Sequence, residues 1–158
     1  MLLTLVRTSE LIKATWDEFD LKGKEWIIPG SRMKMGRPHI VPLSSQVIEL
    51  LKRLKELAGN SHWILPNQVR PQKHMSEGTI LGAIKRLGYK GKMTGRGFRS
   101  LGASAIAEKL GYRREIVDRQ LAHAPESKIE AAYHRADFLT DRCKMMQQWA
   151  DWVEKQEA

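Results

Sequence analysis

The sequence predicts an α+β domain that is mainly helical and carries one small antiparallel β-sheet. Apolar residues recur at helical spacing through most of the chain, and only two short runs, 25–29 and 39–43, have the composition of strands. A basic loop containing Gly and Pro joins these two runs, which favours a hairpin or a small meander. At 158 residues, the chain has the size of one domain that can bury its own core.

Before the strands, the chain opens with an apolar run that ends at Arg7. Thr8 or Ser9 can cap a helix there, and Glu10 would lie favourably at its positively charged end. Helical spacing of apolar residues continues from Glu10 to about Asp20. We therefore expect Arg7 in a turn between two packed elements.

After the strands, capping residues mark a series of helices. Serine precedes the first two of them, Thr94 precedes the third, and glycine follows all three. The expected helices cover 45–58, 77–87, 95–110, 113–121, 129–132 and 139–154. Their expected inward residues are Val47, Leu50, Leu51, Leu54, Leu57, Ile80, Leu81, Ile84, Leu87, Phe98, Leu101, Ala105, Ile106, Leu110, Leu139, Cys143, Met146, Trp149 and Val153.

The charge of the chain favours an anionic partner. The formal net charge is +9 and the pI is about 9.8. Residues 1–123 hold 22 Lys and Arg against 11 Asp and Glu, so the excess lies ahead of the C-terminal segment. Nucleic acid is the first candidate, and a surface of solvated lysines is the plain alternative.

The composition argues against disulfide-bonded, zinc-binding, secreted and membrane proteins. Cys143 is the only cysteine, which excludes an internal disulfide and a zinc site of several thiolates and fits a reducing cytoplasm. The opening apolar run is broken at Arg7, too early for a signal sequence or a membrane span. We expect a soluble protein without metal or cofactor, and a start inside an apolar element suggests that more sequence precedes it.

Five separated groups of residues carry the functional signal. In chain order they are Arg7-x-x-Glu10-Leu11, Lys34 before Val41-Pro42-Leu43, Gly97-Phe98-Arg99, Leu121-Ala122-His123 and Tyr133. In this order and at these separations, the set resembles the tyrosine recombinase (phage integrase) family. The run from Arg32 to Ser44 is especially similar to the integrases of prophages and genomic islands. The resemblance covers nearly the whole chain and implies the catalytic-domain fold of that family.

The resemblance also implies a role for each residue of the set. Tyr133 would attack the scissile DNA phosphate and form a 3′-phosphotyrosine. Arg7 and Arg99 would clamp the non-bridging oxygens, because a forked guanidinium matches a phosphate. Lys34 would protonate the leaving 5′-oxygen, and His123 would donate a hydrogen bond to the phosphate.

Supporting roles follow from the same resemblance. Glu10 is expected to orient Arg7 from behind. The residues expected to contact DNA are Arg32, Arg37, Lys92 and Arg96. Arg96 departs from the family pattern, which usually has His at this position, three residues before the second arginine. A guanidinium binds phosphate but does not readily act as a base, so we expect slow cleavage or a decayed site.

The resemblance further implies partners and surroundings. The partners would be double-stranded DNA attachment sites and other protomers of a tetrameric synaptic complex, docked through the segment 139–154. Residues 1–158 would form a single catalytic domain, a fragment without the N-terminal core-binding and arm-binding domains of the family. We expect it to act in the bacterial cytoplasm, at the nucleoid.

Each residue also has a plain structural interpretation. Alone, Arg7 is a surface ion-pairing residue, Lys34 a solvated lysine, Tyr133 a half-buried packing residue and His123 a capping or core histidine. Only the ordered set favours catalysis. Two other functions remain open. One is a non-catalytic DNA-binding remnant of an integrase, which Arg96 in place of the usual histidine would indicate. The other is a type IB topoisomerase. The similarity of the run from Lys34 to Ser44 to prophage integrases argues against a topoisomerase.

Overall fold

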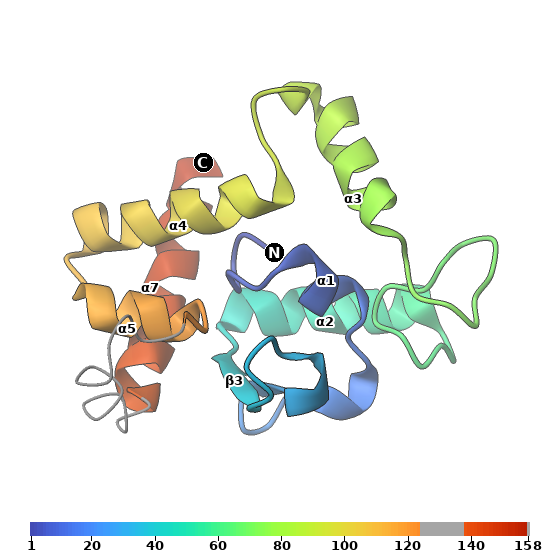
Figure 1. The fold of residues 1–158 in the computed structure, drawn as a ribbon, viewed down its shortest axis with the longest axis horizontal. Helices are drawn as coiled ribbons and strands as arrows, with labels where there is room; N and C mark the ends of the chain where they lie inside the picture. Colours follow the sequence, from blue (N-terminus) through green and yellow to red (C-terminus); the bar gives the residue numbers. More distant parts are fainter. Residues whose placement is uncertain (124–137, 158) are drawn as a thin grey trace.

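One three-stranded antiparallel sheet lies within a mostly helical structure, which confirms the predicted fold class (Figure 1). The computed structural model describes residues 1–123 and 138–157. The strands, in the order β1-β2-β3, are Phe19–Asp20, Glu25–Ile28 and His39–Pro42. The register pairs Phe19 with Trp26, and Trp26 with Val41. The two strands expected from the sequence are present, and the two-residue β1 completes a meander.

The helices begin and end close to the capping residues of the sequence. The side chains of Ser44, Ser76 and Thr94 each accept a hydrogen bond from a backbone N–H of the first turn that follows. Gly111 ends a helix with a φ of 69°. The helices are α1 Thr8–Ile12, α2 Ser45–Ala58, α3 Glu77–Ile84, α4 Gly95–Leu110, α5 Arg114–Gln120 and α7 Leu139–Glu157, with a π-helical turn η3 over Lys85–Tyr89 and 3₁₀ turns η1 over Trp16–Glu18 and η2 over Gly30–Arg32.

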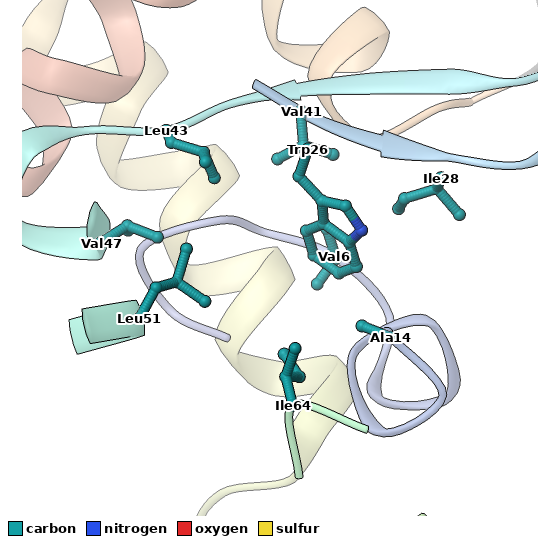
Figure 2. Packing of buried hydrophobic residues seen from close by; sticks show 9 residues of the cluster. All are labelled: Val6, Ala14, Trp26, Ile28, Val41, Leu43, Val47, Leu51 and Ile64. Atoms are coloured by element: carbon teal, nitrogen blue, oxygen red, sulfur yellow. The ribbon is translucent and has the colours of Figure 1, made fainter. Parts of the chain in front are cut away.

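Two hydrophobic clusters meet at the N-terminal segment. One lies between the sheet, α1 and α2, and Figure 2 shows the indole of Trp26 pointing from the sheet into it. The other is built by α4, α5 and α7, which gather on the opposite side of the molecule (Figure 1). Leu5 belongs to the second cluster and its neighbour Val6 to the first, and both side chains are almost completely buried. The N-terminal segment is therefore the seam between two cores.

The predicted helix from Glu10 to Asp20 was wrong in both its start and its length. Arg7 occupies the N-cap position, and neither Thr8 nor Ser9 caps the helix. The helix stops at Ile12 because the chain then leaves it to form an antiparallel bridge between Thr15 and Trp63, with the N–H of Ile64 donating to the carbonyl of Ala14 at 3.1 Å. A distant segment thus overrides the local helical pattern.

Several residues expected to face inward are exposed. They are Leu50, Leu57, Leu81, Leu87, Leu101 and Cys143. In α4 the buried residues are Gly95, Arg99, Gly102 and Ile106, of which Ile106 was expected to face inward. The two glycines let this helix approach its neighbours closely, since a Cβ on Gly102 would lie 2.4 Å from Leu5 Cδ2. Ala105 and Leu110, also expected to face inward, pack against the second cluster. An arginine and two glycines carry no apolar signal, so apolar spacing identified only part of the buried face of α4.

Among the described residues, no helix is long and apolar enough to cross a bilayer. The helix predicted over 129–132 and the residue Tyr133 lie outside the described residues.

Candidate active site

Arg7 is held by a single carboxylate at the start of α1. Its backbone N–H donates to Glu10 Oε2 at 2.7 Å, and its Nη1 donates to Glu10 Oε1 at 2.6 Å. The Glu10 side chain is only 5% exposed, whereas Arg7 is 36% exposed. Glu10 therefore fixes both the backbone and the guanidinium of Arg7 from the protein side, and the outer part of the guanidinium remains open to a ligand.

Arg99 reaches from α4 into the seam between the two cores. Its Nη1 donates to the carbonyl of Leu5, and its Nη2 donates to the carbonyl of Leu121 at 2.9 Å. Leu5 lies two residues before Arg7, and Leu121 lies two residues before His123. One buried guanidinium thus ties together the two segments that carry Arg7 and His123.

Both of these segments contain a residue in the left-handed region. Leu5 has a φ of 56° and Ala122 a φ of 51°. For residues with a Cβ this conformation costs about 1–2 kcal/mol each. Each lies at or beside a carbonyl that Arg99 binds, so these hydrogen bonds help to offset the strain.

The charges around Arg99 form one electrostatic neighbourhood. The pKa of Arg99 is lowered to about 10, first by burial and then by the positive charges of Arg7 and Arg96, while Glu10 acts in the opposite direction. Arg99 still carries its charge at neutral pH. Three arginines and a buried carboxylate therefore act on one another at this place, which gives the region an excess of positive charge suited to an anion.

A groove of about 440 Å³ lies between α4 and α5, and its lining includes Arg96, Arg99, Arg114, Asp118 and His123. Arg96 is exposed at the first turn of α4, while Arg99 lies one turn further at the inner wall. The His123 ring is 48% exposed, with Nδ1 lying 3.1 Å from Asp118 Oδ1. The groove thus brings Arg96, Arg99 and His123 to one surface.

Lys34 lies on an exposed turn between η2 and β3. The N–H of Gly36 donates to the carbonyl of Met33 at 3.0 Å, and the turn has Lys34 and Met35 at its corner. Within 1–123 and 138–157, the structure gives no contact between Lys34 and the other predicted site residues. Arg37 and Lys92 are also exposed on loops, where a ligand can reach them.

Arg32 has a different environment from the one expected of a DNA contact. Its Nη2 pairs with Glu18 and its Nη1 donates to the carbonyl of Glu10 at 3.0 Å. The side chain is 19% exposed. Arg32 therefore binds inward and connects the loop before β3 to helix α1, through the carbonyl of Glu10, and to the turn η1, through Glu18.

A buried polar network that the sequence did not reveal lies behind the site. The Nε2 of His39 lies 3.1 Å from the carbonyl of Gln120, and the Gln120 amide donates to the carbonyl of Thr4 at 3.1 Å. Arg142 of α7 donates through Nε to Gln120 Oε1 at 3.1 Å and through Nη2 to the carbonyl of Ile40. The network joins β3, α5, α7 and the N-terminal segment.

The protonation of this network follows from its burial. The pKa of His39 is lowered to about 4, first by burial and then by the nearby positive charge of Arg142. His39 is therefore neutral at physiological pH, and since it must donate to a carbonyl, its proton is on Nε2. A polar residue at an inward position of a helix, as Arg142 is in α7, was the one signal in the sequence that could have indicated the network.

The described residues hold no group of three or more His, Cys, Asp or Glu that could bind a metal ion.

Comparison with known proteins places this arrangement in a family. A sequence model of the phage integrase family matches residues 1–139. The prophage integrase IntA of Escherichia coli strain K12 is 40% identical over 152 residues, which are 96% of this chain and 37% of that protein. The chain thus spans little more than a third of the length of this relative.

Solved structures agree with the fold. The integrase from mycobacterium phage Brujita has a TM-score of 0.69 at 16% identity, covering 93% of this chain and 48% of that one. The Tn1549 transposon integrase, solved in complex with a circular intermediate DNA, has a TM-score of 0.54 at 15% identity, covering 85% of this chain and 56% of that one. With a family match over most of its length and a cluster of arginines around one groove, the chain belongs to the phage integrase family.

Proposed function

We propose that this chain is the catalytic part of a site-specific recombinase that cleaves and rejoins DNA strands through Tyr133. The observation that supports this most is the position of Arg99, whose buried guanidinium faces the groove near Arg7 and Arg96. A guanidinium has five N–H donors, and Arg99 uses one on each Nη within the protein. The remaining donors are available to a phosphate oxygen.

The proposed reaction is a balanced displacement at phosphorus. The Tyr133 hydroxyl gives its proton to solvent and its oxygen forms a bond to the scissile phosphorus, the bond from phosphorus to the 5′-oxygen breaks, and a 3′-phosphotyrosine remains. Lys34 gives a proton to the leaving 5′-oxygen, and Arg7 and Arg99 neutralise the charge that develops on the non-bridging oxygens. The covalent link retains the energy of the phosphodiester, so rejoining needs no nucleotide cofactor.

For this reaction the Lys34 ammonium must lie at the leaving 5′-oxygen. It lies at the corner of an exposed turn that is tied down at both ends, by Arg32 before it and by His39 after it. We propose that the turn closes on the DNA backbone and brings the Lys34 ammonium to the leaving oxygen. Arg37 on the same loop and Lys92 before α4 are the proposed contacts with flanking phosphates.

The proposed partner is double-stranded DNA in the bacterial cytoplasm. The net charge of +9 supports this, as does the DNA-bound state of the Tn1549 integrase. We also propose assembly into a tetramer on two duplexes. The inner face of α7, with Met145, Met146 and Trp149, is buried in the chain's own core, so the outer face of α7 would make the contact between protomers.

A nicked suicide duplex, which releases a short 5′-terminal fragment on cleavage, tests the reaction. The chain has three tyrosines, Tyr89, Tyr112 and Tyr133. We expect a covalent protein–DNA product in the unmodified chain, in Tyr89→Phe and in Tyr112→Phe, and none in Tyr133→Phe. A covalent product that survives Tyr133→Phe would assign the nucleophile to another residue and refute the proposed role of Tyr133.

The second candidate is a DNA-binding protein without cleavage activity. Arg96 favours it, because the exposed first turn of α4 presents a guanidinium where the family usually has a histidine. This function predicts a salt-sensitive shift of the duplex in a native gel with no covalent product. That outcome, together with unchanged binding by Tyr133→Phe, would replace the first proposal.

A further inference from the structure

We infer that Asp118 is a positioning residue that fixes the tautomer of His123 and leaves its Nε2 as the atom that meets a bound phosphate. The tautomer itself follows from contacts in the described structure. Its consequence for catalysis rests on the function proposed above.

Asp118 and His123 are connected by two hydrogen bonds. Nδ1 of the ring lies 3.1 Å from Asp118 Oδ1, and the backbone N–H of His123 donates to the carbonyl of Asp118 at 3.1 Å. The other carboxylate oxygen, Oδ2, accepts from Arg114 Nε at 3.3 Å. The carboxylate is therefore held from one side by Arg114 and holds the imidazole on the other.

The direction of the ring hydrogen bond follows from the acceptor. An ionised carboxylate has no proton to donate, so Nδ1 must carry the hydrogen. A free neutral imidazole carries its proton mainly on Nε2, so Asp118 reverses the ordinary preference. The partner of one ring nitrogen thereby decides the state of the other. Among the described residues the structure gives Nε2 no partner, and the ring lines the groove beside Arg96 and Arg99.

The place of Asp118 in its helix argues against a role in helix stability alone. It lies in the last turn of α5, where the negative end of the helix dipole disfavours a carboxylate. Its side chain is 31% exposed, so it is not needed to fill the core. The contacts with Arg114 and His123 are therefore the interactions that the Asp118 carboxylate makes in the folded chain.

Within the groove, His123 is the side chain best suited to exchanging a proton. Arg96 and Arg99 stay charged and can only donate hydrogen bonds. With Nδ1 tied to Asp118, Nε2 accepts a proton when the ring is neutral and donates to a phosphate oxygen when the ring is charged. This residue can therefore supply part of the proton exchange that Arg96 cannot.

The tautomer can be measured without any catalytic assay. Long-range ¹H–¹⁵N spectra of the unmodified chain, recorded at about pH 8 where histidine is ordinarily neutral, should show the proton of His123 on Nδ1. Asp118→Ala should move it mainly to Nε2. Glu115→Ala is the matched control, because it removes one carboxylate from the same helix, and it should leave the ring unchanged. A proton on Nε2 in the unmodified chain, or an unchanged tautomer in Asp118→Ala, would overturn the inference.

The catalytic consequence is tested by a double-mutant cycle on the suicide duplex. Asp118→Ala should lower the cleavage rate about 10- to 100-fold, the cost of a misplaced catalytic group, while Glu115→Ala should not. In a His123→Ala background, Asp118→Ala should have little further effect. An equal loss in both backgrounds would show that Asp118 does not act through His123. If the unmodified chain forms no covalent product, the proposed function fails, and the spectra still decide the tautomer.

Discussion

At the scale of single residues, Arg99 combines two roles that are usually separate. It faces the groove, and it also holds the carbonyls of Leu5 and Leu121. Substituting it therefore changes both phosphate binding and the geometry of the segments that lead to Arg7 and His123. Loss of activity in an Arg99 variant cannot be read as loss of a phosphate contact alone.

Replacing Arg99 by lysine should reveal its structural role. A single ammonium reaches at most one of the two carbonyls, and a buried carbonyl left without a donor costs about 1–3 kcal/mol. We expect Arg99→Lys to lower the free energy of unfolding by at least about 1 kcal/mol in urea titrations. Arg96→Lys, one turn earlier and exposed, should change it by less than about 0.5 kcal/mol. Equal stabilities of the two variants would contradict the structural role.

His39 should make stability depend on pH. Its pKa is about 4 in the folded chain and ordinarily 6.5, so between these values the unfolded chain binds a proton that the folded chain does not. Stability should therefore fall as the pH drops from about 6.5 to about 4, by up to about 3 kcal/mol for this group. His39→Gln should remove this part of the pH dependence, and His62→Gln, at an exposed histidine, should retain it.

Arg96→His should restore a group that can exchange protons near neutral pH at the first turn of α4. We expect a higher rate of covalent complex formation on the suicide duplex than in the unmodified chain. Arg96→Gln, which removes the charge without adding a titratable group, is the control. An unchanged or lower rate in Arg96→His would show that Arg96 is not a defect.

At the scale of elements, the sequence predicted most of the fold because capping residues and strand runs are local signals. Ser44, Ser76, Thr94 and Gly111 marked helix ends that the structure confirms. The part that failed depended on distant contacts. The bridge from Thr15 to Trp63 ends the first helical segment early. In α4, close packing through glycine and a buried arginine is invisible to a search for apolar periodicity.

The same distinction holds for the candidate site. The ordered motifs indicated Arg7, Arg99 and His123. The structure places Arg99 and His123 in the lining of one groove, with Arg7 near enough to act on the charge of Arg99. Asp118, Gln120 and Arg142 were missed, because their roles come from hydrogen bonds to residues far away in the chain or to a ring whose orientation no pattern reveals. Tyr133 lies outside the described residues, so its place in the site remains a prediction.

The packing of α4 gives a prediction for its glycines. A Cβ on Gly102 would lie 2.4 Å from Leu5 Cδ2 and 3.4 Å from Trp149 in a closely packed core. Gly102→Ala should therefore destabilise the chain by about 1–3 kcal/mol, despite the higher helix propensity of alanine. Gly78→Ala in α3 has only Ser76 Oγ within reach, at 3.7 Å, and should be neutral or stabilising. Thermal unfolding by circular dichroism compares the two.

At the scale of the whole molecule, the loops and the α4–α5 groove carry the cations proposed to bind DNA. Each lost phosphate contact should reduce the slope of log K against log salt by about 1. We expect Lys34→Ala, Arg37→Ala and Lys92→Ala to show this reduction in anisotropy titrations. Lys52→Ala, an exposed residue of α2 that lies 3.7 Å from Glu49, should keep the original slope.

Arg32 serves as the internal contrast in that experiment. Its guanidinium pairs with Glu18 and the carbonyl of Glu10, so Arg32→Ala should lower stability and leave the salt slope unchanged. A lower slope of log K against log salt in a fully folded Arg32→Ala protein would show that Arg32 contacts DNA after all.

The seam at Leu5 and Val6 determines where the polypeptide tolerates lengthening. Adjacent side chains there enter separate cores, and Arg99 and Gln120 fix the carbonyls beside them. One extra amino acid at that point would take Leu5 or Val6 out of its core. The exposed stretch 68–73, by contrast, lies at the surface and can accept an inserted peptide tag or fluorophore site. Labelling for single-molecule work should therefore begin in that stretch.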